Sequence, residues 1–211
     1  MKKLISIFVV LVVFTVSIFA QGFKVKATST QTFNFEDKAG RNQTTFFSST
    51  MLEDITGLSG GVNGNVTFNI GDLKTLKGKF MVPVATISTG IEMRDKHMLD
   101  EGWLNGEKYP EITFEIKSVN DIKAIADNKI NAKVTGNYTM KGITKEVIAN
   151  TTLTYLDESD VTKSRAPGDL LGVQAKFDIK LSDFGINNKV IGQKVADIIE
   201  INVNMVGSNA K

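Results

Sequence analysis

The chain has 211 residues, with 25 lysines and arginines, 23 aspartates and glutamates, one histidine and no cysteine. Without cysteine, disulfide bonds, thiol catalysis and cysteine-ligated zinc are excluded, and one histidine excludes a two-histidine metal site. Basic and acidic residues are interspersed, so the basic stripe of a nucleic-acid-binding protein is missing. Stability must come from a core, and a chain of this length can build one.

The first 20 residues have the pattern of a secretory signal peptide. Lys2 and Lys3 precede an uncharged apolar run that ends at Ala20, after which the sequence becomes polar. This pattern predicts cleavage after Ala20 and a mature domain, residues 21–211, in the periplasm or outside the cell. The alternative is an uncleaved anchor, although the run is at the short limit for a spanning helix. No later segment is apolar enough to span a membrane, so no stable span is expected after cleavage.

Apolar and polar residues alternate with a period of two through most of the mature chain, which predicts strands with one buried face. Five segments alternate cleanly, and they begin near Ile112, Ile130, Val147, Leu171 and Ile199. The first half is less regular, and the strands predicted there are 23–30, 31–36, 44–51, 62–70 and 77–87. Pro83 suggests an edge or a bulge in the last of these.

These segments give about eight or nine long antiparallel strands joined by hairpins. We expect an all-β domain closed into a barrel, because closure removes exposed strand edges. A β-sandwich is the alternative architecture. An eight-stranded barrel can hold one small ligand in its lumen.

The segment 89–110 interrupts the strand pattern. Thr89 and Glu92 match a capping box, which predicts a helix from about Gly90 to Asp100 or Glu101. The segment also holds the only histidine, His97, and the only tryptophan of the chain. We expect one short helix that flanks the lumen.

No catalytic constellation and no metal site are recognised, and no cofactor is predicted. Asp95 and His97 are two residues apart and point to different sides of the predicted helix, and no nucleophile elbow is present. An apolar lumen instead favours an apolar ligand, with polar groups at the mouth for its head. An enzyme that acts on an apolar substrate through His97 stays a further hypothesis.

The residues predicted to bind the ligand lie in the 89–110 segment, on the predicted strands and, for Phe184, in the Asp-Phe-Gly segment before the last strand: Arg94, His97, Met98, Trp103, Tyr109, Phe80, Phe114, Tyr138, Phe177 and Phe184. Each has a structural alternative. Arg94 and Asp95 could tie the helix to the barrel rim by an ion pair, His97 could be a packing residue, and Trp103 could plug the barrel end.

A second functional hypothesis is a structural or protein-interaction module of the cell envelope without a ligand. Its lumen would be filled by aromatic side chains: Phe33, Phe35, Phe46, Phe68, Phe80, Phe114, Phe177 and Phe184. An interior without a continuous cavity would favour this hypothesis.

Three ordered motifs resemble a known family. They are MRDKHM followed by GWLNGEKYPEITFEI, then GNYTMKGITKEV, and then KLSDFGINN. Together they are similar to the YceI-like family of lipocalin-fold, polyisoprenoid-binding proteins, over about Phe23 to Gly207. Met98 and Glu146 stand where the family usually has leucine and proline.

The resemblance implies an exported, usually periplasmic protein with an eight-stranded antiparallel barrel and a helix near one end. It also implies an elongated lumen that binds a polyisoprenoid or a similar amphiphilic lipid, such as an isoprenoid quinone. The expected partner is therefore a long-chain lipid. The sequence does not indicate the oligomeric state.

Overall fold

The structure, a computed structural model, describes residues 21–210, so the predicted signal peptide lies outside the described residues. Within this range the chain forms ten antiparallel strands and two short α-helices, α1 (Glu92–Leu99) and α2 (Asp160–Lys163). The strands are β1 (Thr30–Asn34), β2 (Gln43–Ser49), β3 (Asp54–Ser59), β4 (Asn63–Asn69), β5 (Asp72–Pro83), β6 (Glu111–Ala126), β7 (Lys129–Met140), β8 (Ile143–Leu156), β9 (Leu170–Lys180) and β10 (Ile198–Ser208).

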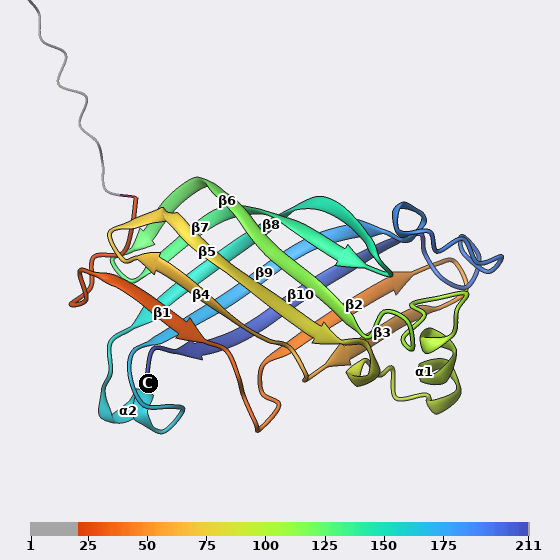
Figure 1. Ribbon diagram of the computed structural model, residues 1–211, viewed down its shortest axis with the longest axis horizontal. Coiled ribbons are helices and arrows are strands. Elements are labelled where there is room, and N and C mark those ends of the chain that lie inside the picture. The colour runs from red at the N-terminus through yellow and green to blue at the C-terminus, as the bar shows by residue number, and fades with distance from the viewer. Residues whose placement is uncertain (1–20, 211) are drawn as a thin grey trace, which may run out of the picture.

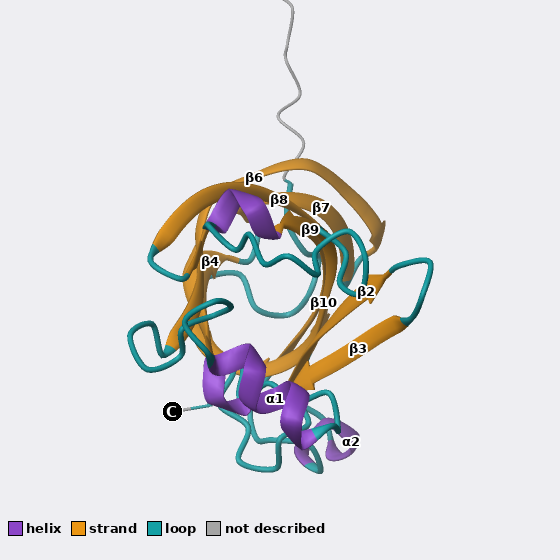
Figure 2. Cartoon of the chain, turned by 90° about the vertical axis from the view of Figure 1, so that its right-hand side faces the viewer, coloured by secondary structure: helices purple, strands orange, loops and turns teal. Residues whose placement is uncertain are grey.

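Eight of the strands close into a barrel. They follow the order β1-β4-β5-β6-β7-β8-β9-β10, and β1 pairs with β10 to complete the ring. The remaining strands, β2 and β3, form an outer hairpin in which β2 pairs with β10. Figure 2 looks along the barrel and shows this hairpin splayed from the ring beside α1. The predicted antiparallel barrel is confirmed, and the sandwich is excluded.

The free edge of β10 changes partner along its length. It pairs with β2 as far as Asn204 and with β1 at Ser208. Between the two partners, the buried Asn42 side chain accepts a hydrogen bond from the Val206 N–H (2.9 Å) and donates to the Val206 carbonyl (3.1 Å). It also donates to the Phe35 carbonyl at 2.8 Å. One amide side chain therefore takes the place of a missing strand, because buried backbone groups must be paired.

The half of the barrel far from α1 is filled, and we call it the packed half. Its aromatic core contains Phe23, Phe33, Phe68 and Tyr155, with neighbouring ring centroids 5.7 to 6.1 Å apart. The N-terminal described residues and α2 lie at this end, while α1 and the β2–β3 hairpin lie at the other (Figure 1). The half nearer α1 is called the hollow half.

Three expectations about the first half of the chain were wrong in detail. Residues 23–29 form no strand; Phe23 crosses the barrel end and donates to the Ile70 carbonyl at 2.8 Å. Strand β3 was not predicted, because its buried positions after Ile55 are the small residues Gly57 and Ser59. Strand β5 ends at Pro83 and starts earlier than expected, so the proline terminates the strand instead of bulging it.

Candidate functional site

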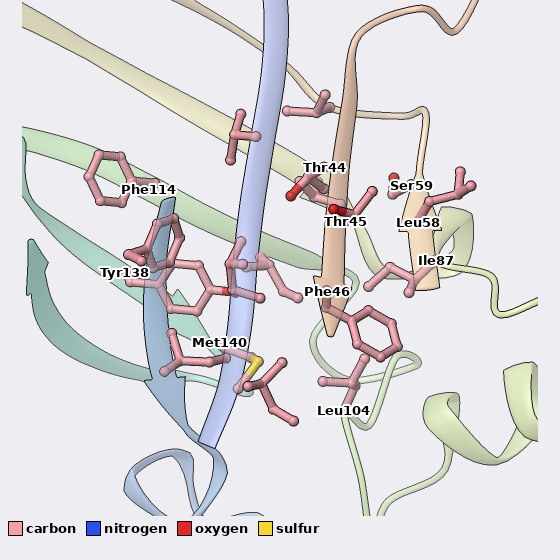
Figure 3. Close-up of a pocket in the computed structure, with 18 of the residues that line it drawn as sticks. Thr44, Thr45, Phe46, Leu58, Ser59, Ile87, Leu104, Phe114, Tyr138 and Met140 are labelled. Atoms are coloured by element: carbon pink, nitrogen blue, oxygen red, sulfur yellow. The ribbon is translucent and has the colours of Figure 1, made fainter. Parts of the chain in front are cut away.

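The hollow half contains a cavity of about 680 Å³. Its floor is the surface of the packed half, and its other end is bordered by α1 and the loop that precedes β10. Figure 3 shows Phe114, Tyr138 and Met140 on one side of this space and Phe46, Leu58 and Ile87 on the other. The lining is largely apolar, and its charged members are Glu53, Arg94 and Lys194.

Aromatic rings lie against the cavity wall where the wall is made of glycine. A Cβ atom at Gly136 would be 2.4 Å from Cζ of Phe114, and one at Gly57 would be 2.2 Å from Cε1 of Phe46. Each ring therefore occupies the space that a side chain of the neighbouring strand would otherwise fill. This arrangement covers the wall and leaves the centre of the hollow half open.

Polar contacts instead of apolar packing position α1, which has no buried residue. The carboxylate of Asp95 accepts hydrogen bonds from Ser88 Oγ (2.6 Å), the Thr89 N–H (2.7 Å) and Thr89 Oγ1 (2.6 Å). These hydrogen bonds hold the pKa of Asp95 below its usual value of 3.8. The predicted capping box is wrong, because Thr89 is engaged by Asp95 and the helix begins after Ile91 without a side-chain cap.

An ion pair joins α1 to the β2–β3 hairpin. Arg94 Nη2 lies 3.1 Å from Glu53 Oε2. Beside it, Leu58 of β3 and Ser88 exchange two backbone hydrogen bonds of 2.8 Å. Arg94 therefore does tie the helix to the rim, as its structural alternative supposed, although its partner is Glu53. Because Arg94 also borders the cavity, the two roles are compatible.

Eight of the ten predicted ligand-binding residues line the cavity: Arg94, His97, Met98, Trp103, Phe80, Phe114, Tyr138 and Phe177. The other two do not. The Tyr109 ring packs against Gly142. Phe184 is buried and meets the Tyr138 ring edge-on at 5.6 Å. It therefore supports the wall from behind.

Sequence reasoning missed two parts of the cavity wall. The β2–β3 hairpin contributes Ile55 and Leu58, and also Phe46, which only the hypothesis of a self-filled lumen includes. The loop before β10 contributes Ile186 and Val190. The apolar residues after the Asp-Phe-Gly motif were an available signal for the loop, but they do not follow a strand period.

The lumen is filled in only one half, so the aromatic residues of the second hypothesis divide into two groups. Phe33, Phe35 and Phe68 are buried in the packed half. Phe184 is buried beside Tyr138 in the hollow half, and Phe46, Phe80, Phe114 and Phe177 line the cavity. Within residues 21–210 there is no cluster of three potential metal ligands. In the same range, no helix has the length and apolar character needed to cross a membrane.

The comparisons with known proteins agree with this fold. A UPF0312 protein of Pseudomonas fluorescens is 30% identical over 131 residues, which are 62% of this chain and 64% of the relative. A UPF0312 protein of Photorhabdus laumondii is 32% identical over 58% of each chain. The aligned region thus spans about three-fifths of the length of these curated relatives.

Solved structures with the same fold include BcnA of Burkholderia cenocepacia, at 20% identity with a TM-score of 0.63, covering 81% of this chain and 99% of BcnA. A polyisoprenoid binding domain from Saccharophagus degradans is 12% identical with a TM-score of 0.64, covering 84% of this chain and 98% of that domain. The pattern that defines the YceI-like domain matches residues 25–207. The chain therefore belongs to the YceI-like domain family.

Proposed function

We propose that this chain is an exported binding protein that sequesters or carries a long-chain amphiphilic lipid in the lumen of its barrel. The lipid class proposed is a polyisoprenoid or an isoprenoid quinone. The observation that carries the proposal is the cavity of about 680 Å³ with an apolar lining. Its volume falls in the range of roughly 300–1,000 Å³ that is usual for small-molecule sites. The polyisoprenoid-binding domain with the same fold supports this lipid class.

The lining of the cavity suits a ligand with a long apolar part. Transfer of apolar surface from water is favourable by about 25 cal/mol per Å². A chain that runs from the α1 end to the floor beside Val66, Leu171 and Met205 would contact apolar side chains along its whole length. Arg94, His97 and Lys194 border the other end, where a polar group on the ligand could meet them or water.

Export is part of the same proposal. The positively charged start and apolar run of residues 1–20 support removal of this segment and a location in the periplasm or outside the cell. Mass measurement of the protein purified from its native host tests this directly. A chain that begins at Gln21 is expected, and an intact start in an otherwise mature protein would contradict export by cleavage.

The ligand is tested by extraction. Protein purified without detergent is extracted with organic solvent, and the extract is analysed by mass spectrometry. We expect a long-chain isoprenoid lipid in stoichiometric amount. Absence of lipid, together with no binding of added long-chain isoprenoids to the emptied protein, would disprove the proposed function.

A pair of variants shows whether the lipid lies in the cavity. Ala149 and Ile148 are neighbours on β8, but Ala149 lines the cavity while Ile148 is 55% exposed on the outer face. Ala149→Phe places a ring in the lumen and should remove most of the co-purified lipid, with a stability cost of about 1–3 kcal/mol. Ile148→Phe is the matched control and should retain the lipid. Equal retention in both variants would place the lipid elsewhere.

A further inference from the structure

The wall of the cavity contains a buried hydroxyl group without a partner. Tyr138, on β7, is 6% exposed and lines the cavity. Among residues 21–210 none forms a hydrogen bond with its Oη atom. The fully enclosed side-chain atoms that lack a partner in this range are Asp157 Oδ1 and Arg165 Nη1. The Tyr138 oxygen is not one of them, so it borders the open space of the cavity, into which its side chain points (Figure 3).

The other deeply buried tyrosine, Tyr155, has the hydrogen-bond partner that Tyr138 lacks. Tyr155, in the packed half, is fully buried, and its hydroxyl donates to Asp169 Oδ2 at 2.6 Å. Buried hydroxyl groups are generally paired, because an unpaired one loses its hydrogen bonds to water without replacement. Tyr138 is the exception in this pair. Its partner therefore comes from the cavity, as water or as a polar atom of a ligand.

The surroundings of Tyr138 select the kind of group. Its ring meets Phe177 and Phe184 edge-on, with centroid distances of 5.6 Å to each. Burial alone raises the pKa of the phenol, and no charged side chain contributes to the shift. The hydroxyl thus stays protonated, and neither of the lining cations Arg94 and Lys194 is hydrogen-bonded to it. An anionic group placed there would lose its hydration without gaining a counter-charge, whereas a neutral oxygen would lose much less.

We infer that the Tyr138 hydroxyl hydrogen-bonds a neutral oxygen of the bound lipid, such as a carbonyl or an alcohol, inside the hollow half. This inference rests on the proposed function and adds the chemistry of the ligand's polar group. The charged lining residues Glu53, Arg94 and Lys194 belong to other parts of the wall. Tyr138 is then a specificity-determining residue that favours neutral oxygen-bearing lipids over hydrocarbons and over anionic lipids that place their charge at this position.

Three probes with the same isoprenoid tail test the inference: geranylgeraniol, geranylgeranyl phosphate and the corresponding hydrocarbon. Binding to the emptied protein is followed by the fluorescence of Trp103, the only tryptophan of the chain, which lines the same cavity. The variants are Tyr138→Phe and, as matched control, Tyr155→Phe. Each removes one buried hydroxyl, and the circular dichroism spectrum of each verifies folding.

In the wild-type protein the alcohol should bind more tightly than the hydrocarbon. Tyr138→Phe should weaken alcohol binding about three- to tenfold, the effect of one hydrogen bond between neutral groups. Binding of the hydrocarbon and of the phosphate should change less than twofold, and Tyr155→Phe should leave all three affinities near the wild-type values.

Two results would overturn the inference while leaving the proposed function intact. One is unchanged alcohol binding in Tyr138→Phe. The other is an equal loss for the alcohol, the phosphate and the hydrocarbon, which would show that the ring matters and its hydroxyl does not. If none of the three probes binds the wild-type protein, the proposed function fails for this lipid class, and the assignment of Tyr138 fails with it.

Discussion

The packed and hollow halves of the barrel are built from the same strands but use their aromatic residues differently. In the packed half, Phe33 stacks on Phe68 and meets Tyr155 edge-on, so rings fill the lumen. In the hollow half, Phe114 and Phe46 lie against glycines of the wall. The filled half is closed by β1 and β10, and the open half is bordered by the β2–β3 hairpin and α1.

This difference teaches that an alternating strand pattern specifies a barrel but not its contents. Aromatic pairs occur in both halves, since Phe114 stacks on Phe177 in the hollow half with centroids 6.1 Å apart. Rings that lie over a glycine also occur in both, since Phe35 of the packed half lies over Gly207. The halves differ because the rings of the hollow half leave a cavity of about 680 Å³ between the strands.

The largest expected effect comes from truncating a ring in the packed half. Phe33 is fully buried, so Phe33→Ala should lower the free energy of unfolding by about 3–5 kcal/mol. Phe46→Ala, in the hollow half, should cost about 1 kcal/mol, since the ring already faces open space. Urea denaturation of the lipid-free proteins measures both. Equal costs would mean that the hollow half is as tightly packed as the other.

Substitution of Asn42, which lies where β10 changes partner from β2 to β1, should lower the free energy of unfolding nearly as much. Asn42→Ala leaves the Val206 N–H and the Phe35 carbonyl buried without their partner. We expect a loss of about 2–3 kcal/mol, because buried unpaired backbone groups are costly. Asn204→Ala, at an exposed position of β10, is the control and should be near neutral. A small loss at Asn42 would show that water replaces its side chain at the edge of β10.

The sequence predicts the second half of the fold well and the first half poorly, and particular residues explain the contrast. Strict alternation from Ile112 onward determines β6 to β10, because each of these strands has one buried face. Strand β3 lacks that signal, since the small residues Gly57 and Ser59 occupy its buried positions. The capping box at Thr89 is a local sequence pattern, and it does not form because the Thr89 hydroxyl donates a hydrogen bond to the Asp95 carboxylate instead.

The candidate site divides in the same way. Inward strand residues such as Phe114 and Tyr138 could be assigned to the lumen from their alternation, and the structure places them there. Phe184 lies beyond the end of β9 in a short 3-10 helix, where no strand period applies, and its ring packs on Tyr138 instead of lining the cavity. The contribution of the loop before β10 depends on tertiary packing that has no period in the sequence.

A smaller difference in stability is expected between variants of the two buried tyrosines, Tyr155 of the packed half and Tyr138 of the hollow half. Tyr155→Phe removes a hydrogen bond to Asp169 and should lower the free energy of unfolding by about 1 kcal/mol. Tyr138→Phe removes a hydroxyl that has no protein partner, so the lipid-free protein should lose no stability. Thermal unfolding of both variants without lipid measures the difference. A loss at Tyr138 equal to that at Tyr155 would reveal a partner for its hydroxyl within the protein.

The smallest expected effect is a pH dependence confined to the hollow half. The pKa of Asp95 is held below its usual 3.8, first by the hydrogen bond from Ser88 and then by that from Thr89. A carboxyl group with a lowered folded-state pKa contributes its full stability above pH 3.8 and loses it as the pH falls through the lower folded-state value. Acidification should therefore loosen α1, and the nearby Trp103 should report the change by fluorescence.

The variant Asp95→Asn cannot titrate at this position, so the Trp103 fluorescence of the variant should lack this acid transition. The effect is small because α1 buries no residue, and water can replace the carboxylate as the acceptor of the hydrogen bonds from Ser88 and Thr89. An identical acid transition in both proteins would assign the pH dependence to other carboxylates and leave α1 held by its ion pair and backbone contacts.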